Sequence, residues 1–108
     1  MNQFAALAEP NRRHIFELIA THGEMVVSQI NAEFDISAPA VSQHLKVLRE
    51  AGLLQMEKRA QQRVYSINPQ GVEEVWQWLN NMRGFWNGSF DRLDSVLSEV
   101  KAKGEVKR

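Results

Sequence analysis

The sequence predicts a mainly α-helical domain that carries a small β-hairpin. Apolar residues recur at helical spacing in four segments before residue 51, and the pattern then changes to alternation over residues 53–67. A final apolar stripe returns to helical spacing near the end of the chain. A length of 108 residues is that of one domain, which we place at residues 1–101, with a frayed tail over 102–108.

The first two helices are predicted from their apolar sides and their ends. A short helix at residues 2–8 has Phe4 and Leu7 as its apolar side. The second helix opens at Pro10, because proline needs no hydrogen-bonding N–H in a first turn. Gly23 can close it in the left-handed conformation.

Two further helices follow, joined by a tight link. Residues 26–34 predict the third helix, although Val26 stands where a capping serine or threonine is expected. Ser37 caps the fourth helix, over residues 38–50, and Gly52 ends it. Two short helices joined by such a turn form the helix-turn-helix arrangement.

The hairpin is predicted from two alternating runs, residues 53–59 and 63–68. Residues 60–62, Ala-Gln-Gln, join the runs and contain neither the glycine nor the asparagine typical of tight hairpin turns. Gly71 then belongs to the turn that leads into the last helix.

The final stripe predicts one long helix of about 38 Å at 1.5 Å per residue. Gly84 and Gly88 fall on the opposite side, so the stripe keeps its phase, but continuity of the helix through them stays open. The stripe consists of Val75, Leu79, Met82, Trp86, Phe90, Leu93, Leu97 and Val100.

The net charge is zero, but the charges are unevenly placed. Residues 1–36 hold two cations and five carboxylates, a net of −3, whereas residues 37–69 hold five cations and two carboxylates, a net of +3. The remaining residues balance. Positive charge therefore gathers where the fourth helix and the hairpin lie, although a solvated surface of chance composition would look the same.

Several classes of site are excluded by composition. The chain has no cysteine, which rules out disulfides, thiolate metal sites and cysteine nucleophiles. His14, His22 and His44 show no i, i+4 pairing, so we predict no metal site and no cofactor. No carboxylate pair or nucleophile–base pair indicates an enzyme. Without a membrane span or signal peptide, a cytoplasmic protein is expected.

The fourth helix has an apolar side and a polar side on a wheel of about 100° per residue. The apolar side is formed by Val41, Leu45 and Leu48. Glutamine, serine and lysine can all bond base edges in the major groove of DNA. Any surface helix is polar on its outer side, so this feature alone does not decide the function. The polar side and its flank hold Pro39, Ser42, Gln43 and Lys46.

The hairpin tip carries Lys58, Arg59 and Arg63, with Gln61 and Gln62 between them. Cations on a narrow loop suit phosphate contact or a narrow minor groove. A soluble turn would carry the same charges. The combination of a capped helix, a preceding short helix with a tight turn, and a cationic hairpin directly afterwards favours DNA binding.

Three stretches resemble the winged helix-turn-helix repressors of the ArsR type: EPNRRHIFELI, DISAPAVSQHLKVLREAGLL and QQRVYSINPQG. The resemblance runs from Phe4 to Leu97. It implies a homodimeric repressor of transcription whose partner is a palindromic, double-stranded operator DNA. The helix at 38–50 would then read the major groove through Pro39, Ser42 and Gln43, and the wing at 58–63 would touch the minor groove or backbone.

The resemblance also implies that the first and last helices form the dimer interface. For His44 it suggests a phosphate contact, and a packing or local hydrogen-bonding role stays equally open. Relatives that sense metals use cysteines on the third helix or histidines on the last helix, and this chain has neither. The expected interface residues are Phe4, Leu7, Val75, Leu79, Met82, Trp86, Phe90, Leu93 and Leu97.

Two alternatives remain at this stage. The three tryptophans, Trp76, Trp78 and Trp86, fit a dimer core but also the wall of a small-molecule pocket, which leaves an effector open. The polar surface could also dock a protein instead of DNA. Salt dependence separates DNA from protein, because DNA binding releases counterions.

Overall fold

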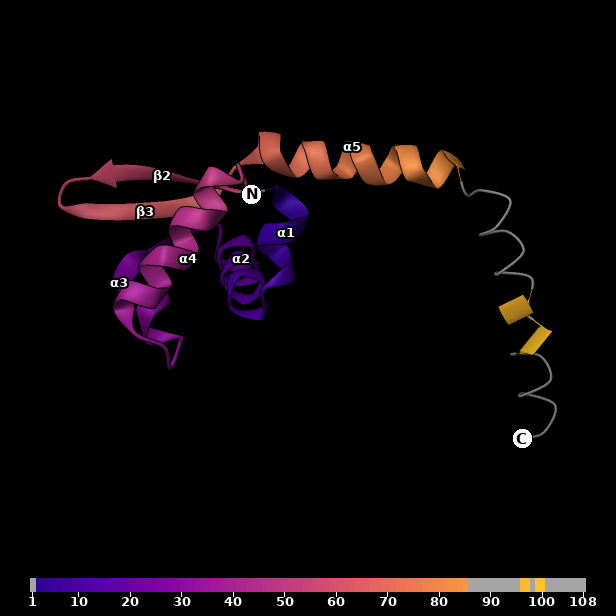
Figure 1. Cartoon of the computed structure of the whole chain (residues 1–108). Coiled ribbons are helices and arrows are strands. Elements are labelled where there is room, and N and C mark those ends of the chain that lie inside the picture. Colours follow the sequence, from indigo (N-terminus) through magenta and orange to yellow (C-terminus); the bar gives the residue numbers. More distant parts are fainter. Residues whose placement is uncertain (1, 86–95, 98, 101–108) are drawn as a thin grey trace. The chain divides into compact units, whose positions relative to one another are not determined.

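The computed structural model describes residues 2–85, 96–97 and 99–100, and it confirms the mainly helical fold with a hairpin (Figure 1). The chain divides into two units, Met1–Val75 and Trp76–Arg108. In chain order the elements are α1 (Gln3–Ala8), α2 (Pro10–His22), β1 (Glu24–Val26), α3 (Val27–Ala32), α4 (Ala38–Glu50), β2 (Leu54–Arg59), β3 (Gln62–Ile67) and α5 (Pro69–Phe85).

Helix α1 is held at both ends by side chains, as a six-residue helix requires. At its start, the Asn2 side chain accepts a hydrogen bond from the N–H of Ala5 at 2.8 Å. At its end, the Arg12 guanidinium donates to the carbonyl of Ala6 at 2.8 Å. Arg12 therefore has a structural role, because it satisfies carbonyl groups that the helix itself leaves unpaired.

Helices α2 and α4 begin and end as predicted. The Ser37 side chain caps α4 by accepting from the N–H of Ala40 at 3.3 Å. Gly23 follows α2 with a φ of 84°, and Gly52 follows α4 with a φ of 79°. Both glycines therefore adopt the left-handed backbone that side chains with a Cβ rarely take.

The third helix is shorter than the prediction of residues 26–34, because α3 covers only Val27–Ala32. Val26 cannot cap it with its side chain. Instead, the Gln29 side chain reaches back and accepts a hydrogen bond from the N–H of Val26 at 3.0 Å. The segment before α3 forms β1, a strand that the sequence did not predict.

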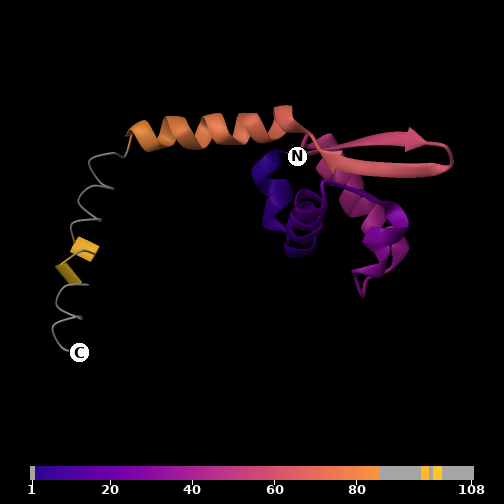
Figure 2. The ribbon, with the colours of Figure 1, turned by 180° about the vertical axis from the view of Figure 1, so that it is seen from behind.

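The three strands form one antiparallel sheet in the order β1-β3-β2. The hairpin turn is tighter than predicted, since β3 already starts at Gln62 and only two residues lie between the strands. Ala60 takes the left-handed backbone in this turn, with a φ of 55°. The two views in Figures 1 and 2 both show β2 and β3 as a paired ribbon that reaches away from the helices.

One apolar core joins the helices of the first unit to the sheet. The predicted apolar sides of α2 and α4 are buried in it, as are one residue of β1 and Tyr65 of β3. The largest fully buried side chains of this core are Ile15, Ile19, Ile30, Val41, Leu45, Leu48 and Leu53.

Gly71 shows how closely the start of α5 approaches the end of α4. A Cβ at Gly71 would clash with the carbonyl oxygen of Gly52, which is backbone and cannot move aside. A hydrogen bond of 2.8 Å from the Gln3 side chain to Glu74 ties the same start of α5 to α1. The first turn of α5 is thus fixed on the first unit.

Helix α5 exposes much of its apolar surface. Trp76 is 56% exposed, Trp78 47% and Leu79 49%. Met82 is half-buried, and Val75 packs against the core of the first unit. The predicted stripe residues Trp86, Phe90 and Leu93 and the tail at 102–108 lie outside the described residues. Of the helices that the structure describes, none has the length and hydropathy that crossing a membrane requires.

Candidate nucleic-acid interface

Helix α4 presents different chemistry on different sides. Val41, Leu45 and Leu48 are buried against the core, as the helical wheel predicts. Pro39 and Gln43 are exposed on the far side. Since Ser37 caps the helix start, the backbone of the first turn of α4 is well defined.

One flank of α4 carries His44, which faces the junction of α1 and α2. Its ring Nδ1 lies 3.8 Å from the carboxylate of Glu9, and its side chain is 19% exposed. Glu9 also caps α2 by accepting from the N–H of Arg12 at 2.8 Å. This contact favours the packing role left open for His44. The phosphate contact stays a prediction.

The same contact helps to set the charge state of Glu9. Burial alone would raise the pKa of the Glu9 carboxyl, but hydrogen bonds from N–H groups of α2 and the charge of His44 lower it below 4.5. Because folding lowers this pKa, the ionised Glu9 carboxylate and its hydrogen bonds stabilise the fold above about pH 4.5. This stabilisation is lost as the pH falls through the lowered pKa of Glu9.

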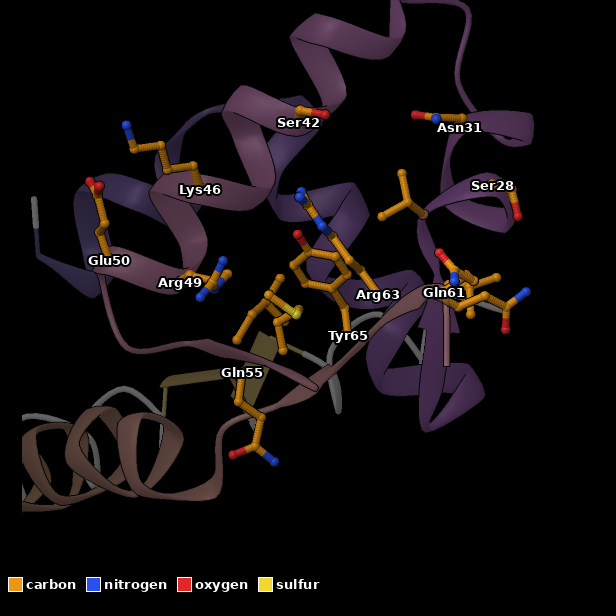
Figure 3. Close-up of a pocket in the computed structure, with 15 residues that line it drawn as sticks. Ser28, Asn31, Ser42, Lys46, Arg49, Glu50, Gln55, Gln61, Arg63 and Tyr65 are labelled. Atoms are coloured by element: carbon orange, nitrogen blue, oxygen red, sulfur yellow. The ribbon is translucent and has the colours of Figure 1, made fainter. Parts of the chain in front are cut away.

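The other flank of α4 faces a groove of about 1100 Å³ between α3, α4 and the hairpin (Figure 3). Ser42 and Lys46 line it from the helix, and Gln61, Gln62 and Arg63 line it from the hairpin. The structure therefore brings together five residues that the sequence analysis assigned to DNA binding from two separate elements.

The two faces of the hairpin carry their charges differently. Lys58 of β2 and Arg63 of β3 are direct cross-strand partners, so their side chains leave the same face. Both side chains are exposed. Within the part of the chain that the structure describes, neither one has a hydrogen bond or ion pair to a protein group.

Arg59, in contrast, is engaged within the protein. Its guanidinium bonds the carboxylate of Glu24 on β1 at 2.8 Å and that of Glu57 at 3.1 Å. The hydrogen bond to Glu24, followed by the one to Glu57, raises the pKa of Arg59. The sequence analysis treated Arg59 like the other two hairpin cations, Lys58 and Arg63. It could not separate them, because Glu24 becomes the partner of Arg59 only through the unpredicted strand β1.

The groove also contains residues that the sequence analysis did not assign to DNA binding. Besides Tyr65 and apolar residues, these are Ser28 and Asn31 of α3, Arg49 and Glu50 of α4, and Gln55 of β2. For Arg49 a signal was present, because residues 42, 46 and 49 share the i, i+4, i+7 spacing of one helix face. Ser28 and Asn31 reach the groove through the packing of α3 on α4, which no local pattern reveals.

Among the described residues, no group of three or more histidines and carboxylates is placed to hold a metal ion. The polar groups of this region are mostly amides, hydroxyls and cations, with the one carboxylate of Glu50, and they come from α3, α4 and the adjoining hairpin. Such side chains can donate hydrogen bonds to base edges and to phosphates.

Comparison with known proteins identifies the fold. The family model described as bacterial regulatory protein, arsR family, matches residues 9–55. HTH-type transcriptional regulator Rv2034 of Mycobacterium tuberculosis is 43% identical over 81 residues, which cover 75% of this chain and 72% of that protein. Transcriptional repressor SdpR of Bacillus subtilis is 32% identical over 80 residues, which cover 74% of this chain and 88% of that protein. The chain belongs to the ArsR family.

A solved structure agrees with this assignment. It is described as a possible transcriptional regulator for arsenical resistance, with 38% identity and a TM-score of 0.70, and the match covers 88% of this chain and 95% of that one. The resemblance stated from the sequence is thereby confirmed. As a member of the ArsR family, the protein is a DNA-binding transcriptional regulator with a winged helix-turn-helix fold, and not an enzyme.

Proposed function

We propose that the protein is a homodimeric repressor that binds a palindromic operator. Helix α4 enters the major groove with Pro39, Ser42 and Gln43 at the base edges, and the hairpin tip at 58–63 touches the adjacent minor groove or backbone. The observation that carries this proposal is the exposed polar side of α4 beside a groove shared with hairpin cations. In this role the protein acts on DNA in the cytoplasm.

The operator can be found before any regulated gene is identified. Purified protein is mixed with random genomic fragments, and the retained DNA is sequenced. We expect one recurring palindrome whose half-sites lie about 34 Å apart, one turn of DNA. Retention of DNA without any shared sequence would contradict the proposed operator-specific repressor. Retention of none, even at low salt, would favour a protein-docking role.

Gln43→Ala tests the reading of bases by α4. Gln43 is exposed on the outer side of the helix near its start. A bidentate contact from glutamine to adenine contributes about 1–3 kcal/mol of discrimination between bases. We therefore expect Gln43→Ala to lose affinity for the best operator but much less for single-base variants at one position. An equal loss on every sequence would exclude direct readout by Gln43.

The proposal of a homodimer rests on exposed apolar side chains. Phe4 on α1 is 42% exposed, and Val72 in the first turns of α5 is 37% exposed. Further along the chain, Leu79 and Leu97 are 49% and 55% exposed. Burying such surface between two copies would remove it from water, and a two-fold axis would present two recognition helices to a palindrome.

Leu79→Glu tests the dimer, with Trp78→Glu as its control on the same helix. A charge on the predicted stripe should dissociate the dimer, whereas Trp78 lies off the stripe and its replacement should do less harm. Sedimentation at micromolar concentration and operator binding are measured for both variants. A wild-type protein that sediments as a monomer and still binds operator DNA would contradict the proposed dimer.

A further inference from the structure

The groove between α4 and the hairpin separates two elements that the proposed function places in neighbouring grooves of DNA. Neighbouring grooves of a duplex are separated by one sugar-phosphate strand. If α4 lies in the major groove and the hairpin tip lies at the minor groove, one strand must pass between them. The protein surface facing that strand is the groove lined by Ser42, Arg49 and Arg63.

We propose that this groove binds the phosphodiester backbone of one DNA strand, and that Arg49 and Arg63 are its two phosphate-binding side chains. This inference rests on the proposed function. It adds Arg49, which lies outside the outward face of α4, and it assigns Arg63 to the backbone instead of the minor groove. The two arginines come from different elements, so a phosphate held by both would also fix the hairpin relative to α4.

The helix side of the groove is a single stripe. Ser42, Lys46 and Arg49 lie within roughly 60° of one another on α4 and span about 10 Å along its axis. All three are exposed and line the groove (Figure 3). Beyond Ser42, which the proposed function places at the base edges, the stripe supplies two cations along one line, and such a line suits successive phosphates of one strand.

The hairpin side supplies a second, independent observation. Lys58 and Arg63 are direct cross-strand partners, and like charges in such positions are unfavourable. Figure 3 shows Arg63 directed from β3 into the space between the hairpin and α4. A phosphate beside Arg63 would offset the repulsion from Lys58. The unbound hairpin therefore carries a charge arrangement that an anion stabilises.

The charge balance of the groove supports an anionic occupant. Its lining holds three cations, Lys46, Arg49 and Arg63, against one carboxylate, Glu50, on a chain of zero net charge. Among the described residues, none of these cations has a protein partner by hydrogen bond or ion pair. Arg49 presents a planar set of donors that can bond two phosphate oxygens at once.

The test compares Arg49→Gln and Arg49→Lys with the wild-type protein on operator and random DNA. We expect Arg49→Gln to weaken both, because phosphate contacts carry no sequence information. Each phosphate contact adds a further loss of affinity of about 3.5-fold between 50 and 200 mM salt. Arg49→Gln should therefore reduce the loss of affinity over this range by about 3.5-fold for each protomer. Arg49→Lys keeps the charge and should restore most of the salt dependence.

A second arm locates the phosphate. Operator phosphates are replaced one at a time by neutral methylphosphonates. One replacement per half-site should weaken the wild type more than it weakens Arg49→Gln. Arg63→Gln should likewise lose part of its sensitivity at the same or the next phosphate. Glu50→Gln should tighten binding more than Glu17→Gln, which makes the same change in net charge on α2, outside the groove.

The outcomes are distinguishable. If the wild type binds its operator but Arg49→Gln keeps its affinity, salt dependence and methylphosphonate profile, this inference is wrong and the proposed function stands. If the wild type binds no DNA, the proposed function and this inference fall together. Thermal unfolding of each variant shows whether the fold is intact. A folded Arg49→Gln that retains full binding cannot be reconciled with the phosphate contact.

Discussion

The two faces of the hairpin carry similar cations that differ in whether a carboxylate of the protein binds them. On one face, Lys58 and Arg63 stand opposite each other without a described protein partner. On the other face, Arg59 is bonded by the carboxylates of Glu24 and Glu57. Each strand of the hairpin is six residues long, so the paired and the unpaired cations lie only a few ångströms apart.

This difference shows that charge content alone does not locate a DNA-binding surface. A cation that already bonds two carboxylates must break those bonds before it can bind a phosphate. A cation without a partner gives up only water. On this basis the face with Lys58 and Arg63 is assigned to DNA, and Arg59 is assigned to holding the hairpin on β1.

The largest effect is expected for Arg63→Gln. The loss of an unpaired groove cation should weaken binding to operator and random DNA alike and lower the salt slope by about 1 per protomer. Fluorescence anisotropy with labelled duplexes at several salt concentrations measures both quantities. Weakening confined to one operator sequence would instead assign Arg63 to base readout.

A gain in binding is expected for Glu24→Gln. This change removes the shorter of the two carboxylate contacts of Arg59, 2.8 Å long, and leaves Glu57 as its one remaining partner among the described residues. Part of the Arg59 charge then becomes available to phosphate. Affinity for random DNA should rise, and the salt slope should increase. Glu17→Gln is the matched control, because it removes one negative charge from α2 away from the hairpin. If both variants gain equally, net charge alone explains the effect.

A smaller effect, on stability, is expected for Ala60→Gly in the turn between the two faces. Ala60 has a φ of 55°, which is unfavourable for a residue with a Cβ. Glycine removes that strain but increases the entropy of the unfolded chain, so a net stabilisation of about 0.5 kcal/mol is expected. Urea unfolding should show a higher midpoint with an unchanged slope. The salt slope of DNA binding should stay the same, because the turn carries no charge.

Of the two arginine variants of the hairpin, Arg59→Gln is expected to have the smaller effect on DNA binding. The lost ion pairs are exposed on the surface, where such pairs contribute little to stability. Binding should change by less than in Arg63→Gln, although both variants lose one positive charge. Chromatography and thermal unfolding confirm that the hairpin is intact before the binding curves are compared.

The parts of this comparison that were predictable from the sequence are local. These parts are the cap at Ser37, the first-turn proline Pro10, the left-handed residues Gly23 and Gly52, and the buried side of α4, all of which follow from patterns within a few turns of helix. The hairpin followed from alternation. In each case one short segment determines its own conformation through backbone sterics and amphipathic spacing.

The missed parts depend on contacts between distant segments. Strand β1 has three residues and exists because it pairs with β3, about forty residues later in the chain. Without β1, the partner of Arg59 could not be identified. The groove residues Ser28 and Asn31 likewise depend on how α3 packs against α4. The sequence therefore located the candidate interface but not which of its cations are paired within the protein.

The most direct test of this account is the salt slope of three proteins measured side by side. Wild type, Arg59→Gln and Arg63→Gln are titrated with one operator between about 50 and 200 mM salt, and log affinity is plotted against log salt. The account predicts that Arg63→Gln has a slope lower by about 1 per protomer and that Arg59→Gln follows the wild type. Equal slopes for the two variants would contradict the assignment of one hairpin face to DNA.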